Sequence, residues 1–184
     1  MSGSPVYLAG LDLRGRRVLI AGAGAVAARR IPALLDAGAL VHVVAPAAVA
    51  AIVAWADAGA LTWSRRPVGD ADADGAWYAQ ALTDDPDANA RLVAACSARR
   101  VFCVRGDDAA SGTARTPATG SAGDLTVGVI GDRDPRRSAT ARDAAVAALT
   151  HPRPAGQADA GRAQGRSENE RTKTGTSGDD ADAS

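Results

Sequence analysis

The chain has 184 residues, 46% of them hydrophobic, with 21 basic and 21 acidic side chains, as expected for a globular protein of one domain or slightly more. A zero net charge gives no overall attraction to nucleic acid or to an anionic membrane, so neither is expected as a partner. Cys96 and Cys103 lack CxxC spacing and only two histidines occur, so no metal site is expected. No stretch of about 20 apolar residues and no apolar leader is present, which predicts a cytoplasmic protein.

The composition divides the chain into three parts. Residues 152–184 contain no Val, Ile, Leu, Met or aromatic residue, so they cannot bury apolar surface and are predicted to form a disordered tail. Such a tail is either a linker to another domain or a plain extension. Before it, we expect a dinucleotide-binding domain at 1–106 and a smaller element for dimerisation and substrate binding at 107–151.

Short β-branched runs alternate with Ala-rich runs of helical length over the first 105 residues or so. This alternation is typical of a Rossmann-like, doubly wound parallel α/β sheet with right-handed crossovers. The pattern then changes to a Gly-, Ser-, Thr- and Asp-rich loop at 106–123, followed by a short appended β-α element. The predicted strands are 17–21, 40–44, 61–65, 77–82, 101–104 and 125–130, and the predicted helices are 25–37, 46–58, 86–98 and 135–149.

A glycine-rich turn follows the first predicted strand and opens the first predicted helix. Its sequence, Gly22-Ala-Gly24-Ala25-Val26-Ala27, has the GxGxxG/A arrangement. The first glycine permits a tight turn, the second lets the backbone approach a pyrophosphate, and the last small residue lets helix and strand pack closely. The helix N-terminus would then offer N–H groups to the phosphates. The motif predicts dinucleotide binding, although a turn that merely packs would show the same residues.

The acidic residue that usually binds the adenine ribose, about 20 residues further on, is missing. The second strand ends in Val44-Ala45-Pro46, so backbone groups at 45–47 would have to hold the ribose, or affinity is modest. Arg29 and Arg30 either attract a 2′-phosphate or are solvated helix charges. After the fourth strand, Thr83 and Asp84 either contact the cofactor or cap the next helix.

These residues, taken in order, resemble the NAD-dependent precorrin-2 dehydrogenases of siroheme synthesis and the N-terminal module of siroheme synthase. The resemblance covers nearly all of residues 5–149. The matching segments are Leu11-Asp-Leu-Arg-Gly-Arg-Arg17 and the strand Val18 to Ala21, the glycine turn with Arg29-Arg30, Leu34-Leu-Asp-Ala-Gly-Ala39, Val43-Val-Ala-Pro46, Trp77 to Leu82 then Thr83-Asp-Asp85 with Asn89, Arg100-Val-Phe-Cys-Val104 leading to Asp107, and Thr116-Pro-Ala118.

The resemblance implies a Rossmann domain, a dimerisation region and oxidation of precorrin-2 to sirohydrochlorin with NAD. By position, it implies dinucleotide contacts at Ala25, Val26, Pro46 and Ala47. The glycine motif adds Gly22 and Gly24, and the end of the fourth strand adds Thr83 and Asp84. The family's key aspartate falls on Asp107, as general base or as a group that holds the ring nitrogens. Without the resemblance, Asp107 would be assigned to a turn or a helix cap.

The substrate carries several carboxylates, so we expect positive charge and N–H donors around it. Arg136, Arg137 and Ser138, with the nearby Arg133 and Arg142, form the densest basic cluster and are assigned to substrate binding, with a solvated helix face as the alternative. The predicted strand after Gly123 and the helix after Pro135 are short and apolar on one side, which favours a homodimer.

The sequence leaves three alternatives to the dehydrogenase open: a regulatory module, an inactive partner and ferrochelatase activity. The chain resembles the dehydrogenase module without the family's further helical domain, so it is either an enzyme, an NAD-binding regulatory module, or an inactive dimerisation partner. Ferrochelatase activity on sirohydrochlorin, with the same aspartate, is a further alternative. Turnover of precorrin-2 separates the enzyme from the regulatory and inactive modules.

Overall fold

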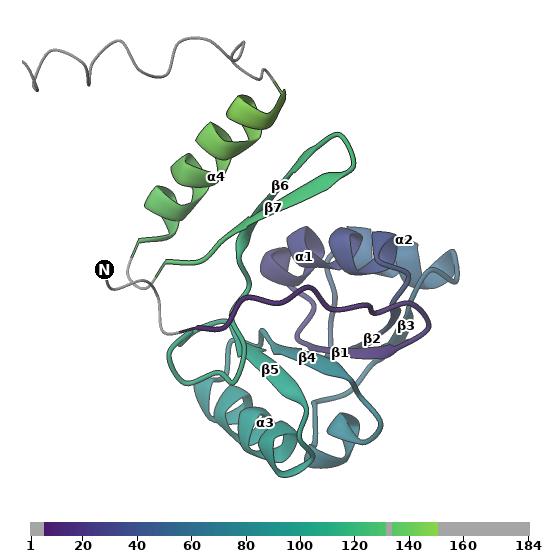
Figure 1. The fold of residues 1–184 in the computed structure, drawn as a ribbon. Helices are drawn as coiled ribbons and strands as arrows, with labels where there is room; N and C mark the ends of the chain where they lie inside the picture. The colour runs from purple at the N-terminus through teal and green to yellow at the C-terminus, as the bar shows by residue number, and fades with distance from the viewer. Residues whose placement is uncertain (1–5, 132–133, 151–184) are drawn as a thin grey trace, which may run out of the picture.

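The computed structural model describes residues 6–131 and 134–150, and the tail predicted at 152–184 lies outside this range. The chain forms an α/β body that carries a smaller projecting unit (Figure 1). In chain order the elements are β1 (Arg17–Ala21), α1 (Ala25–Asp36), β2 (Leu40–Val44), α2 (Ala50–Asp57), β3 (Thr62–Ser64), the 3₁₀ turn η1 (Asp70–Ala73), β4 (Tyr78–Ala81), α3 (Pro86–Ala98), β5 (Phe102–Arg105), β6 (Ala118–Ala122), β7 (Leu125–Val129) and α4 (Pro135–Thr150).

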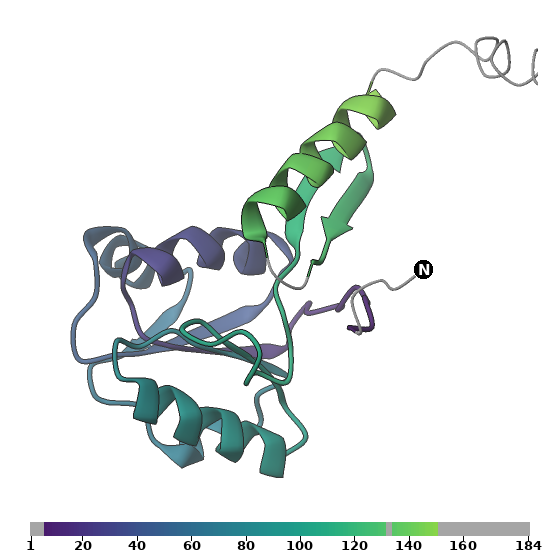
Figure 2. The same cartoon turned by 90° about the vertical axis from the view of Figure 1, so that its left-hand side faces the viewer.

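The body is a five-stranded parallel sheet in the order β3-β2-β1-β4-β5. Helices α1 and α2 cover one face, and α3 with η1 covers the other (Figure 2). From β1 the chain adds β2 and β3 on one side of the sheet and then β4 and β5 on the other. Open α/β sheets bind their ligands at such a switch point, at the carboxyl ends of the strands. The predicted doubly wound Rossmann-like sheet is confirmed.

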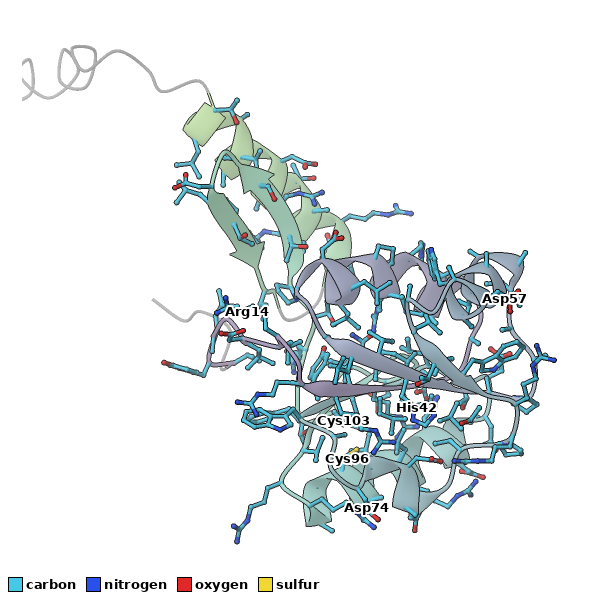
Figure 3. The ribbon with its side chains drawn as sticks, turned by 90° about the vertical axis from the view of Figure 1, so that its right-hand side faces the viewer. Arg14, His42, Asp57, Asp74, Cys96 and Cys103 are labelled. Atoms are coloured by element: carbon cyan, nitrogen blue, oxygen red, sulfur yellow. The ribbon has the colours of Figure 1, made fainter. Side chains whose placement is uncertain are left out.

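Alternate residues of β1 enter two separate cores. Val18 and Ile20 pack under α1 and α2 with Ile31 and Ile52, while Leu19 and Ala21 face α3. Because both faces of the strand are covered, the strand is continuously apolar and not alternating. Cys96 of α3 and Cys103 of β5 are free thiols buried in the second core, between α3 and the sheet (Figure 3).

Several predicted boundaries are wrong. A strand, β6, occupies Ala118–Ala122 inside the predicted loop, and it pairs antiparallel with β7. Helix α2 starts at Ala50 and not at Pro46, because residues 46–49 form a loop that returns to the glycine turn through the bond from Val49 N to the Ala23 carbonyl. The N-cap of α3 is Asp85, whose carboxylate accepts from the N–H groups of Asp87 and Ala88, and neither Thr83 nor Asp84.

The β6–β7 hairpin and α4 form a unit of their own at residues 118–150. Helix α4 packs on both strands, and a Cβ at Gly120 would come within 2.6 Å of the Arg142 side chain and 2.9 Å of Val146. No described residue of these three elements is fully buried, and Leu125 and Leu149 are about half exposed. The unit thus leaves apolar surface in contact with solvent. Among the described residues, no helix is both long enough and apolar enough to cross a membrane.

Candidate dinucleotide and substrate site

The glycine turn lies at the carboxyl end of β1 and contacts both neighbouring strands. The Gly22 N–H donates to the carbonyl of Val44, the last residue of β2, while the N–H of Leu82, just after β4, donates to the Ala21 carbonyl. Gly22 has a φ of +97°, and a Cβ there would lie 2.4 Å from the Leu82 carbonyl oxygen. Only glycine fits this position, for reasons of both conformation and space. Ala27, buried against the sheet, fills the small-residue position of the motif.

The space in front of α1 is open. A Cβ on Gly24 would meet no atom within 4 Å, and no side chain caps this helix. The first-turn N–H groups at Ala25 and Val26 therefore face a region that can take a phosphate group, which helix N-termini favour. The open space at Gly24 and the uncapped helix start thus fit the phosphate groups of a dinucleotide.

The loop after β2 borders the same turn. Pro46 and Ala47 are exposed, and Val49 ties the loop to Ala23. The Ala45 carbonyl already accepts the indole N–H of Trp63 at 3.0 Å. The ribose would therefore meet backbone and small side chains here, with no carboxylate in the expected position.

Arg30 points away from this loop. Its guanidinium donates to the Gln80 amide oxygen on β4 at 3.1 Å, and burial lowers its pKa. Arg29 is exposed. The bond to Gln80 places Arg30 on the β4 side of α1 and not at the end of β2, where a 2′-phosphate would lie.

Thr83 and Asn89 join the ends of β4 and β5. Asn89 is 1% exposed, and its amide oxygen accepts from the Thr83 backbone N–H at 3.0 Å and from the Thr83 hydroxyl at 2.8 Å. Its NH₂ group donates to the Thr83 carbonyl and to Asp107 Oδ1, both at 2.9 Å. The buried amide thus fixes Asp107 relative to the turn after β4. Asp84 is exposed beside it.

Asp107 follows β5, and both of its carboxylate oxygens also accept hydrogen bonds from Arg105. The guanidinium donates from Nη2 to Asp107 Oδ2 at 2.8 Å and from Nε to Oδ1 at 3.1 Å. These bonds, with the one from Asn89, lower the pKa of Asp107 to about 2. Asp107 is therefore an anion at neutral pH and a weak proton acceptor. Asp108 instead accepts from Ala110 and Ser111 within its own loop.

A cavity of about 540 Å³ lies between the end of β5 and the junction of β7 with α4, and Arg105, which binds Asp107, is one of its lining residues. Its walls include Gly106 and Ala109, the residues on either side of the Asp107-Asp108 pair, and the hydroxyl-bearing Thr116 and Ser138; Asp107 itself is not a lining residue. The arginines in its lining are Arg30, Arg105 and Arg115.

The structure therefore brings Ser138 into this cavity. Arg136 and Arg137 are exposed on the first turn of α4 and are not among the lining residues. Sequence reasoning missed Arg105 and Arg115, because a single arginine in or after a strand carries no local signal for a site.

Comparison with known proteins identifies the family of the chain. A family model described as "Putative NAD(P)-binding" matches residues 9–118. The siroheme synthase of Shigella boydii serotype 18 (strain CDC 3083-94 / BS512) is 47% identical over 92 residues, which are 50% of this chain and 20% of that protein. The siroheme synthase of Escherichia coli (strain K12 / DH10B) gives the same values. The chain thus spans about a fifth of the length of these relatives.

A solved structure, "SirC, precorrin-2 dehydrogenase", aligns with a TM-score of 0.67 and 28% sequence identity, over 77% of this chain and 70% of that one. The family model spans well over half of this chain and includes the glycine turn, β1 to β5 and Asp107. The chain therefore belongs to this NAD(P)-binding family.

Proposed function

We propose that this chain oxidises precorrin-2 to sirohydrochlorin with NAD. The observation that carries the proposal is the fixed carboxylate of Asp107. Asn89 links it to the cofactor edge of the sheet, and Arg105, which binds it, lines a cavity together with Arg30 and Arg115. The names of the siroheme synthases and of SirC support the same reaction. Formation of sirohydrochlorin by the purified chain, followed by its absorbance under anaerobic conditions, is the test.

The reaction removes two hydrogens from the macrocycle, one as a hydride and one as a proton. When bound at the glycine turn, the nicotinamide cofactor would supply the hydride acceptor, and the proton would leave to water. The residues of the chain bind and orient the substrate and the cofactor. Asp107, held as an anion, accepts a hydrogen bond from a ring N–H and stabilises the positive charge that the ring gains as the hydride leaves. A proton acceptor with a pKa of about 2 would be inefficient, so the general-base role is the weaker of the two predicted roles.

The cavity beside Asp107 is proposed to hold the substrate's carboxylates. Guanidinium groups match carboxylates in geometry and charge, and Arg30, Arg105 and Arg115 all lie in its lining, together with Ser138. The predicted contacts from Arg136 and Arg137 remain a proposal. Their exposed side chains on α4 would meet substrate groups that project from the cavity.

NAD is proposed over NADP, with contacts at Gly22, Gly24, Ala25, Val26, Pro46, Ala47, Thr83 and Asp84. Arg30 is bonded to Gln80 on the β4 side of α1 and lines the cavity. The loop at Pro46 and Ala47 offers no positive side chain of its own to a 2′-phosphate. Turnover with NADP equal to that with NAD would contradict this choice.

The rate should be independent of pH between about 5 and 8 as far as Asp107 is concerned. Its pKa in the folded protein is about 2, below the ordinary value of 3.8, so the carboxylate is ionised throughout this range. Protonation of Asp107 would lower kcat only as the pH falls toward about 2. The measurement is kcat with saturating precorrin-2 and NAD. A fall in kcat at the acidic end of this range that Asp107→Asn abolishes would contradict the ionised, hydrogen-bonded role.

A homodimer is proposed through the unit at residues 118–150. The support is its exposed apolar surface, including Leu125 and Leu149. Sedimentation equilibrium should give twice the chain mass, and Leu125→Asp should shift the protein toward monomer. A wild-type protein that stays monomeric at micromolar concentration would rule the dimer out. We further propose that residues 1–106 form the cofactor domain and residues 107–151 the dimerisation and substrate element.

A further inference from the structure

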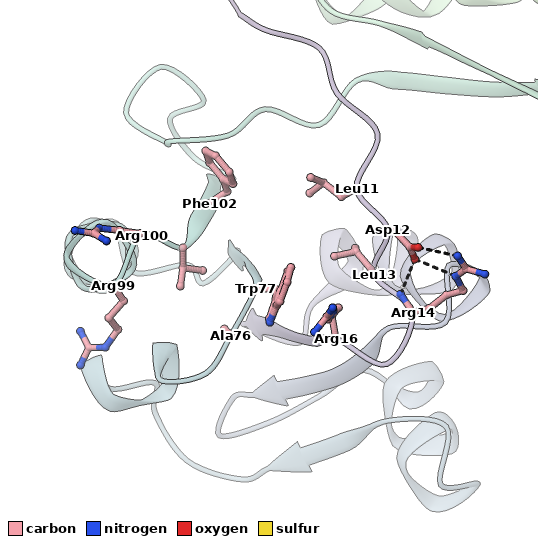
Figure 4. A pocket seen from close by; sticks show the side chains of 11 residues that line it. Leu11, Asp12, Leu13, Arg14, Arg16, Ala76, Trp77, Arg99, Arg100 and Phe102 are labelled. Carbon is pink, nitrogen blue, oxygen red and sulfur yellow. Dashed lines mark hydrogen bonds and ion pairs between the residues drawn. The ribbon is translucent and has the colours of Figure 1, made fainter.

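A groove of about 600 Å³ lies at the amino-terminal edge of the parallel sheet, at the opposite end of the strands from the glycine turn. Trp77, just before β4, and Phe102, which begins β5, contribute two aromatic rings to it (Figure 4). Leu11 from the segment before β1 adds an aliphatic side chain. The proposed dehydrogenation uses none of these residues.

The aromatic rings of the groove are unusually open to solvent. Trp77 is 55% exposed and Phe102 is 57% exposed, in a chain that has only three Trp and one Phe. The guanidinium of Arg16 stacks on the Trp77 ring, 3.8 Å from its centroid. Exposed rings that lie together favour a bound ligand with a flat, apolar core.

Four arginines and one aspartate line the same groove. Arg14 pairs with Asp12 and Arg99 with Asp74. Within residues 6–131 and 134–150, Arg16 and Arg100 have no carboxylate within 4.0 Å.

The arginines stand on two sides of the rings. In Figure 4, Arg99 and Arg100 lie on one side of Trp77 and Phe102, and Arg14 and Arg16 lie on the other. A complementary ligand carries negative groups at opposite edges of its flat core. This favours a ring with carboxylates around it over a nucleotide, whose charge lies at one end.

Arg100 occupies a backbone position that favours glycine. It follows α3 with a φ of +58°, and it is the only described residue other than glycine with a positive φ. Glycine would end the helix without strain, but it would leave the groove without a guanidinium. Arg100 thus places a guanidinium at the groove from a position where glycine is the usual residue.

We propose that this groove is a second tetrapyrrole site, separate from the dehydrogenation site, which stacks a flat polycarboxylate ring on Trp77 and Phe102 and binds its carboxylates with Arg16 and Arg100. The choice of a tetrapyrrole rests on the proposed function. The groove itself requires a flat apolar core with carboxylates on two sides.

The test is equilibrium dialysis of the full chain, loaded with NAD, against uroporphyrin, a stable flat tetrapyrrole with carboxylates around the ring that this reaction does not oxidise. Arg100→Gly and Trp77→Ala should each weaken binding at this site about 10-fold or more. Arg100→Gly should also raise Tm because it relieves the strained φ, so its loss of binding does not reflect misfolding. Arg65→Ala, which removes another arginine stacked on a tryptophan, should bind as wild type.

Absence of uroporphyrin binding, or equal binding by wild type, Arg100→Gly and Trp77→Ala, would overturn the proposal. Binding that Arg105→Ala removes and Arg100→Gly does not would place the ligand in the cavity beside Asp107 and would also overturn it. Precorrin-2 turnover is measured separately, and Arg100→Gly should keep the wild-type kcat. If the groove binds uroporphyrin while no variant or wild type turns over precorrin-2, the proposed function fails and the groove site stands.

Discussion

Replacing Asp107 by alanine should lower kcat for precorrin-2 oxidation by about 10²- to 10³-fold, the usual loss when one fixed electrostatic contact to a transition state is removed. The carboxylate is held by Asn89 and Arg105, so it pays little reorganisation cost when the ring charge develops. The affinity for NAD should stay within about 2-fold of wild type, because the glycine turn is untouched. The measurement is anaerobic turnover together with NAD binding by calorimetry.

Asp108→Ala is the matched control for Asp107→Ala. Asp108 is the neighbouring carboxylate, but its partners, Ala110 and Ser111, lie within its own loop. It should keep most of the wild-type kcat. If Asp108→Ala is inactive and Asp107→Ala is active, the family's key aspartate has been assigned one residue too early. If both variants are as active as wild type, neither carboxylate takes part.

Gly22→Ala should destabilise the fold by roughly 3 kcal/mol or more, because it combines overpacking with backbone strain. The added Cβ would lie 2.4 Å from the Leu82 carbonyl oxygen and 2.9 Å from the Thr83 nitrogen, both of which are backbone atoms just after β4. The φ of +97° adds strain that no rotamer relieves. Urea denaturation measures the loss.

Gly24→Ala should weaken cofactor binding without disturbing the fold. A Cβ there meets no atom of the chain and the φ is −85°, so stability should change by less than about 1 kcal/mol. The methyl group would stand where the pyrophosphate approaches, so NAD affinity should fall about 10-fold or more. Unchanged NAD affinity in a folded Gly24→Ala protein would contradict the placement of the dinucleotide over this turn.

Local sequence signals predict much of this fold. The glycine turn is readable because each of its positions has its own steric demand, and those demands are met at Gly22 and Ala27. The central strands are readable because they are rich in apolar residues, such as residues 18–21 of β1, which two-sided burial requires. Strand β6 was missed because Ala-Thr-Gly-Ser-Ala has neither β-branched enrichment nor alternation, and its small residues reflect close packing against α4.

The environment of the candidate site is less readable from sequence. Asp107 was assigned through family resemblance alone, since an aspartate in a Gly/Asp loop is typical of a turn. Its bonds to Arg105 and Asn89 depend on the parallel register that aligns the ends of β4 and β5. The groove at the other edge was missed because Trp77 was assigned to a strand, whereas β4 begins one residue later and leaves the ring exposed.

The most direct test of the central claim is anaerobic incubation of the purified chain with freshly generated precorrin-2 and NAD, and separately with NADP. We expect the absorbance of sirohydrochlorin to appear with NAD, in step with NADH formation, and to appear much more slowly with NADP. A protein that binds NAD, keeps its fold and yields no sirohydrochlorin with either cofactor would contradict the proposed function.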